Sequence, residues 1–121
     1  MNTLRGSTLT IAAAATLALA APAFAHTEVK STSPKAGGKA PTTITRVTVT
    51  FGEAIRTGTL KVYGPGGGRV SKGSGGRDPR KITRLKAGLK GSLGTGRYTA
   101  KWHATAADGH HQHGSFHFRL R

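Results

Sequence analysis

The residues of this sequence best suited to chemistry are histidines, and four of the six lie between residues 110 and 117. The chain has only four acidic residues and no cysteine, and its one methionine is Met1. Soft ions such as Cu(I) prefer sulfur ligands, whereas imidazole, carboxylate, amine and carbonyl groups suit harder ions such as Cu(II). The composition therefore favours a nitrogen- and oxygen-ligated metal, and we see no catalytic triad or paired-carboxylate site. The six histidines are His26, His103, His110, His111, His113 and His117.

The N-terminal segment has the three parts of a secretory signal peptide. Arg5 supplies the positive start, residues 9–20 form an apolar run, and Ala23-Phe24-Ala25 is a small-x-small cleavage site. The alternative is a retained anchor, but a membrane-spanning helix needs about 20 apolar residues. We expect a cleaved signal peptide at residues 1–25 and one exported domain at residues 26–121, periplasmic or secreted.

Cleavage after Ala25 would make His26 the first residue of the exported chain. Its α-amine and its imidazole Nδ1 could then close a six-membered chelate ring on a metal. An unperturbed α-amine has a pKa of about 7.7–8.0, so a metal can displace its proton at neutral pH. The alternative is that the protease happens to cut before a histidine.

The run Asp108-Gly109-His110 could complete such a site. It offers one carboxylate and one imidazole, and Gly109 gives the backbone freedom to bring both side chains to one point. With His26, the set would supply three nitrogens and one oxygen, which suits the tetragonal geometry of Cu(II). The alternative for Asp108 is an Asx turn ahead of the glycine.

Apolar and polar residues alternate with a period of two through residues 47–51, 60–62, 98–104 and 116–120. Such alternation predicts half-buried β-strands, and short strands separated by turns predict a β-sandwich or small barrel. Residues 33–38 read as a loop, and the glycine-rich residues 64–80 as a mobile loop or long hairpin connection. The predicted core comprises Val47, Val49, Phe51, Leu60, Val62, Tyr98, Trp102, Phe116 and Phe118.

Several pieces, in order, resemble the CopC-like bacterial copper-resistance proteins along most of residues 26–121. They are His26 after the cleavage site, Ser33-Pro34-Lys35-Ala36-Gly37, Val49-Thr50-Phe51-Gly52-Glu53, Gly96-Arg97-Tyr98-Thr99-Ala100-Lys101-Trp102, Asp108-Gly109-His110 and Gly114-Ser115-Phe116-His117-Phe118. The resemblance implies an all-β, Greek-key (immunoglobulin-like) sandwich that carries or buffers Cu(II) in copper homeostasis or resistance.

The same resemblance implies that His26, Asp108 and His110 ligate the Cu(II), with Glu53 as a nearby acid in an outer or auxiliary role. His111 and His113 are either solvated residues or auxiliary ligands, since i and i+2 side chains lie near each other. His103 and His117 fall on the polar faces of their strands, where they are exposed residues without a role or, alternatively, pair with each other across the sheet. We expect no Cu(I) site, because no methionine would remain after cleavage.

The charge is strongly positive, with 19 Lys and Arg against 4 Asp and Glu. A basic exported chain could bind polyanions or the cell wall, which is the alternative function, whereas specific nucleic-acid binding is not expected. Copper monooxygenases also begin with a metal-binding histidine, and form a less favoured alternative. We expect a monomeric, non-enzymatic copper-binding protein that works with a separate membrane copper transporter. The cations proposed for polyanion binding are Lys30, Lys35, Lys39, Arg69, Lys72, Arg77, Arg80 and Lys81.

Overall fold

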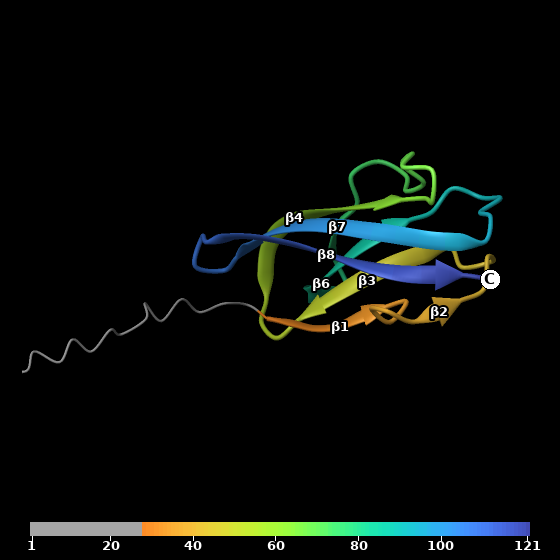
Figure 1. Cartoon of the computed structure of the whole chain (residues 1–121). Coiled ribbons are helices and arrows are strands. Elements are labelled where there is room, and N and C mark those ends of the chain that lie inside the picture. The colour runs from red at the N-terminus through yellow and green to blue at the C-terminus, as the bar shows by residue number, and fades with distance from the viewer. Residues whose placement is uncertain (1–27) are drawn as a thin grey trace, which may run out of the picture.

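The computed structural model describes residues 28–121, which form eight β-strands in two facing sheets (Figure 1). The predicted signal peptide and His26 lie outside the described residues. No helix in the described part of the chain is long and apolar enough to cross a membrane. The strands are β1 (Val29–Ser33), β2 (Lys39–Ala40), β3 (Arg46–Phe51), β4 (Ile55–Tyr63), β5 (Gly76–Asp78), β6 (Lys81–Gly88), β7 (Gly96–Ala106) and β8 (His111–Leu120).

The two sheets have four strands each, in the orders β1-β3-β6-β5 and β2-β8-β7-β4. The chain passes from one sheet to the other in every connection except β5–β6 and β7–β8, so that β3 pairs with β6 while β4 pairs with β7. This crossing between sheets is typical of Greek-key sandwiches. The predicted all-β sandwich is confirmed.

The core lies between the sheets, where the inward side chains of alternate strand positions meet. Every predicted core residue is buried, and the ring of Trp102 packs edge-on against Phe51 with 4.9 Å between ring centroids. The strand β6 was not predicted, and it adds Leu85 and Ala87 to the same core. The other buried apolar residues are Ile55, Leu89, Ala100, Ala104, Ala106 and Leu120.

The glycine-rich segment at residues 64–80 is more ordered than the predicted loop. It contains β5, and the buried Ser71 accepts a hydrogen bond at 2.9 Å from the backbone N–H of Val62. Asp78 is also buried and binds the guanidinium of Arg84 at 2.7 Å. These buried polar contacts hold the segment to both sheets, and the alternative of a long hairpin connection is wrong, because β4 and β6 lie in different sheets.

Candidate metal centre

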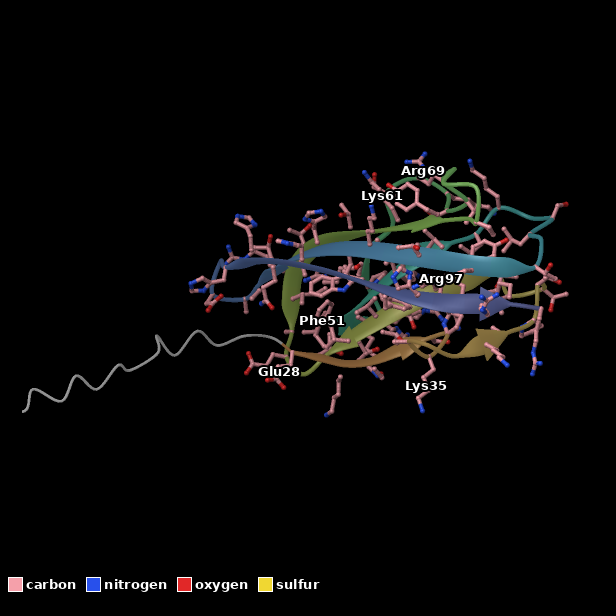
Figure 2. The ribbon with its side chains drawn as sticks, viewed as in Figure 1. Glu28, Lys35, Phe51, Lys61, Arg69 and Arg97 are labelled. Atoms are coloured by element: carbon pink, nitrogen blue, oxygen red, sulfur yellow. The ribbon has the colours of Figure 1, made fainter. Side chains whose placement is uncertain are left out.

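Three segments that are distant in sequence meet at one end of the sandwich. Ile55 at the start of β4 pairs with Ala106 at the end of β7, and the backbone N–H of Gly52 donates to the carbonyl of Glu28 at 2.9 Å. Figure 1 shows the start of β1 and the β7–β8 hairpin at this end, and Figure 2 places the side chains of Glu28 and Phe51 there. The described chain therefore begins at the same end of the sandwich as the hairpin that carries the Asp108-Gly109-His110 run.

The β7–β8 hairpin turns sharply through this run. The N–H of Ala106 donates to the carbonyl of His110 at 2.9 Å, and the N–H of Gly109 donates to the carbonyl of Ala106 at 2.9 Å. Gly109 has a φ of 93°, a conformation that a residue with a Cβ rarely adopts. The glycine thus lets the chain fold back within three residues and brings Asp108 over His110.

Asp108 and His110 form a compact donor pair. Oδ1 of Asp108 accepts from the backbone N–H of His110 at 3.0 Å, so the Asx turn offered as the structural alternative is present. Oδ2 lies 2.8 Å from Nδ1 of His110, and both side chains are about half exposed. The backbone N–H of His110, and next its imidazole, hold the pKa of Asp108 below its usual range. The carboxylate is consequently ionised at neutral pH.

The spacing of this pair fits metal ligation. Two ligand atoms held at right angles on one ion, each about 2.0–2.1 Å away, are roughly 2.9 Å apart. The observed 2.8 Å between Oδ2 and Nδ1 is a hydrogen bond, so an ion would replace the proton between these atoms with little change in their spacing. The turn geometry and the ligand role are therefore compatible, because Oδ1 holds the turn while Oδ2 faces the imidazole.

The other predicted site residues lie near this pair or farther along the strands. Glu53 is exposed in the turn between β3 and β4, at the same end of the sandwich. His111 lies on β8, where its Nδ1 is 3.1 Å from Oγ1 of Thr105. Within residues 28–121, no three His, Asp or Glu side chains converge as a metal site, and the predicted third ligand, His26, precedes that range.

The remaining histidines lie on the outer face of β7 and β8. His113, and not His117, is directly opposite His103, with 5.7 Å between ring centroids, so the alternative of a His103–His117 pair is wrong. His117 lies farther from the hairpin turn, and its Nδ1 is 3.0 Å from Oγ1 of Thr99.

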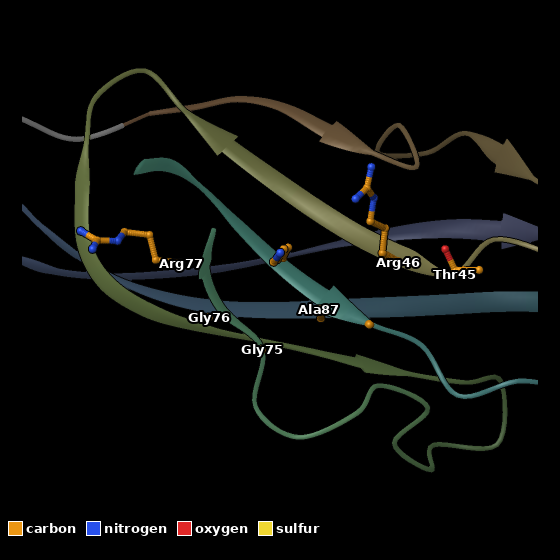
Figure 3. A pocket seen from close by; sticks show the side chains of 8 residues that line it. Thr45, Arg46, Gly75, Gly76, Arg77 and Ala87 are labelled. Atoms are coloured by element: carbon orange, nitrogen blue, oxygen red, sulfur yellow. The ribbon is translucent and has the colours of Figure 1, made fainter. Parts of the chain in front are cut away.

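A hollow of about 530 Å³ on the first sheet contains cations but no acid among its lining residues (Figure 3). Two of these cations bind within the protein. Arg77 donates to the carbonyl of Ile55 at 3.1 Å, and the ammonium of Lys86 lies 3.8 Å from Asp78. The hollow is therefore a poorer candidate site than the hairpin end.

The sequence and the fold both match known proteins. The chain is 27% identical over 100 residues to Protein YobA of Escherichia coli K12 and of Shigella flexneri, covering 81% of this chain and 81% of each relative. The solved structure of CopC from Methylosinus trichosporium OB3b superimposes with a TM-score of 0.65 at 22% identity, covering 78% of this chain and 93% of that one.

A second solved structure is PcoC, a methionine-rich copper resistance protein from Escherichia coli. It superimposes with a TM-score of 0.64 at 20% identity, covering 79% of this chain and 99% of that one. At this level of identity, the structural matches establish the shared fold. The CopC domain description matches residues 29–121, which is most of the chain. The chain belongs to the CopC domain family.

Proposed function

We propose that this protein is an exported Cu(II)-binding protein that carries or buffers copper in copper homeostasis or resistance. Its ligands are the α-amine and Nδ1 of His26, a carboxylate oxygen of Asp108 and the imidazole of His110. The observation that carries the proposal is the 2.8 Å pair of Asp108 and His110, at the end of the sandwich where the described chain begins.

The position of Glu28 supports a role for His26. Glu28 is the first described residue and is hydrogen-bonded to Gly52 at the hairpin end. His26 precedes it by two residues, and two extended residues span about 7 Å. An N-terminal chelate at His26 would therefore extend from the end of the sandwich that also carries the pair.

The available donor atoms favour Cu(II) over Cu(I). The chain has no cysteine, and its one methionine is Met1 in the predicted signal peptide, so the exported domain would offer only nitrogen and oxygen. PcoC, by contrast, is described as methionine rich. Membership of the CopC domain family and the likeness to a copper resistance protein support copper as the cargo.

The remaining roles follow from the same proposal. Residues 1–25 are a signal peptide, residues 26–121 are the working domain, and the protein acts in the periplasm or outside the cell as a monomer. Glu53 is an outer, auxiliary acid of the site. A separate membrane transporter exchanges copper with the protein, and the protein has no catalytic role.

Protein recovered from the periplasmic or secreted fraction tests both the predicted cleavage site and the selectivity for Cu(II) over Cu(I). Intact-mass spectrometry is expected to show a chain that begins at His26. Titration against a competing chelator is expected to show one tight Cu(II) site, and anaerobic titration with Cu(I) no comparable site. A different first residue, or equally tight Cu(I) binding, would overturn the proposal.

Polyanion binding is a second candidate function, supported by the outer face of the second sheet. Lys61 is paired with Lys101 across β4 and β7, and Arg97 is paired with Arg119 across β7 and β8. Lys101 and Arg97 also line a hollow of about 600 Å³. This face concentrates positive charge, and no acid is among the residues lining the hollow. Polyanion binding here is compatible with copper binding at the hairpin end.

A further inference from the structure

His103 and His113 form a cross-strand pair on the outer face of β7 and β8. They are directly opposite in the ladder, and both are exposed to solvent. Their ring centroids are 5.7 Å apart and the ring planes are inclined by 38°. Side chains opposite one another in an antiparallel pair leave the sheet on the same side, so both imidazoles face the same solvent.

The distance between the rings fits two imidazoles on one metal ion. An imidazole nitrogen binds a transition ion at about 2.0–2.1 Å, which puts the ring centroid about 3.2 Å from the ion. Two such rings then lie about 4.5 Å apart at a nitrogen–metal–nitrogen angle of 90°, and about 6.4 Å apart at 180°. The observed 5.7 Å falls inside this range, so only side-chain rotation is needed to aim both nitrogens at one ion.

The surroundings leave room for the other ligands of such an ion. A hollow of about 210 Å³ adjoins His103 and is lined by several hydroxyl-bearing side chains, so water molecules can complete the coordination. His111 borders the same hollow, but its Nδ1 is engaged with Thr105. Lys101 also lies on this face and repels a cation, which makes the pair a weaker site than an N-terminal chelate.

We propose that His103 and His113 form a second metal site, which takes a divalent transition ion such as Cu(II) or Zn(II) through two imidazoles. The site shares no ligand with the proposed His26, Asp108 and His110 centre. It goes beyond the proposed function, because the protein would then hold two ions of unequal affinity on one hairpin.

The test is a stepwise titration with Cu(II) of protein that begins at His26. The parent is expected to bind a second, weaker equivalent, with pulsed EPR couplings from two imidazoles. His103→Ala and His113→Ala are each expected to weaken that second equivalent at least tenfold and to leave the first unchanged. Asp108→Ala is expected to do the reverse, so that failure of one site is distinguishable from failure of the other.

His117→Ala is the matched control, because His117 lies on the same face of β8 and its Nδ1 is 3.0 Å from Oγ1 of Thr99. It is expected to leave both equivalents unchanged. Thermal unfolding checks that each variant is folded, and His113→Asn replaces His113→Ala if the alanine variant is unstable. A single equivalent in the parent, or an equal loss of the second equivalent in His117→Ala, would overturn the proposal.

Discussion

The two carboxylate oxygens of Asp108 make different contacts. Oδ1 closes the turn on the backbone N–H of His110, and Oδ2 faces the imidazole of the same residue. Asparagine can keep the first contact, because its amide oxygen also accepts a hydrogen bond, but it carries no negative charge. Asp108→Asn therefore separates the structural contribution of this residue from its contribution to metal binding.

We predict that Asp108→Asn and His110→Ala each lower Cu(II) affinity by more than the roughly 10–100-fold that is typical of losing a residue behind a ligand. Asp108→Asn is expected to keep the thermal stability of the parent. His117→Ala is expected to keep the parent affinity, since its imidazole lies near Thr99 far from the turn. Chelator competition at fixed pH gives the affinities. If His111→Ala proved more damaging than His110→Ala, the ligand assignment within this run would be wrong.

Asp78 contributes to stability rather than to the site. The backbone N–H of Arg80, and next the guanidinium of Arg84, hold its pKa below the ordinary value of 3.8. Because the folded carboxylate binds a proton less readily than the unfolded one, its contribution is fully present above the unfolded pKa. That contribution is lost as pH falls through the lower, folded pKa.

We predict that the melting temperature of the parent exceeds that of Asp78→Asn near neutral pH, and that the gap narrows as pH falls below about 4. Asp108 is common to both proteins, so its own titration cancels in the comparison. Melting curves measured between about pH 6 and pH 2.5 provide the check. A gap that stays constant over this interval would show that the Asp78 carboxylate does not act through its charge.

The β7–β8 hairpin positions both the proposed copper centre and the histidine pair. Its close packing depends on Gly114, which lies opposite Trp102 in the ladder. A Cβ added at Gly114 would lie 2.6 Å from Cζ2 of Trp102, closer than real contacts allow. The indole or the hairpin backbone would have to shift, and the indole already packs against Phe51.

We predict that Gly114→Ala lowers the free energy of unfolding by about 1–3 kcal/mol, as overpacking generally does. Gly91→Ala is the control, because a Cβ there would meet nothing within 4 Å. Urea unfolding followed by Trp102 fluorescence measures both variants. Equal stability of Gly114→Ala and Gly91→Ala would show that the indole adapts without cost.

The sequence predicts the four strands that alternate clearly, and misses β1, β2, β5 and β6. Residues 47–51 and 98–104 show their inward faces plainly, and the structure buries them as expected. In β6, Ile82 is half exposed while Leu85 and Ala87 point inward, so the apolar residues do not alternate regularly with polar ones. Without a regular alternation the sequence does not predict this strand, and its neighbour β5 falls in the segment predicted as a loop or connection.

The candidate site was predictable in part. The Asp108-Gly109-His110 run could be identified because a glycine between two ligand types is a local signal. The pairing of His103 with His113 depends on the hairpin register, which becomes known only once Ala106 is seen to bond to His110. His103 lies three residues before Ala106, and His113 lies three residues after His110, so the two are opposite in the ladder. The sequence alone does not show at which residues the turn closes.

The molecule as a whole is strongly cationic, with 19 basic and 4 acidic residues. We predict that it binds a sulfated polysaccharide such as heparin, and that binding weakens steeply as salt rises, because release of counterions drives such association. Lys61→Gln combined with Lys101→Gln is expected to lower the salt needed for elution from heparin. Lys30→Gln combined with Lys81→Gln, on strands β1 and β6 of the first sheet, is the control with the same charge change. An equal decrease in the elution salt concentration for the two double variants would mean that binding depends on net charge and not on this face.

The proposed copper centre joins the N-terminus of the exported chain to the hairpin at the far end of the sequence. Anything attached ahead of His26 would convert its α-amine into an amide and remove the chelate ring, while the imidazole, Asp108 and His110 would remain. The imidazole of His26 would then be the one remaining ligand from this end of the chain.

The decisive comparison uses two proteins, one that begins at His26 and one that carries a single glycine ahead of it. Cu(II) affinity and the EPR spectrum are measured for both at the same pH. We predict that the added glycine weakens the tight site by more than roughly 100-fold and changes the nitrogen couplings. Equal affinities and identical spectra would contradict the account, because they would show that the α-amine of His26 is not a ligand.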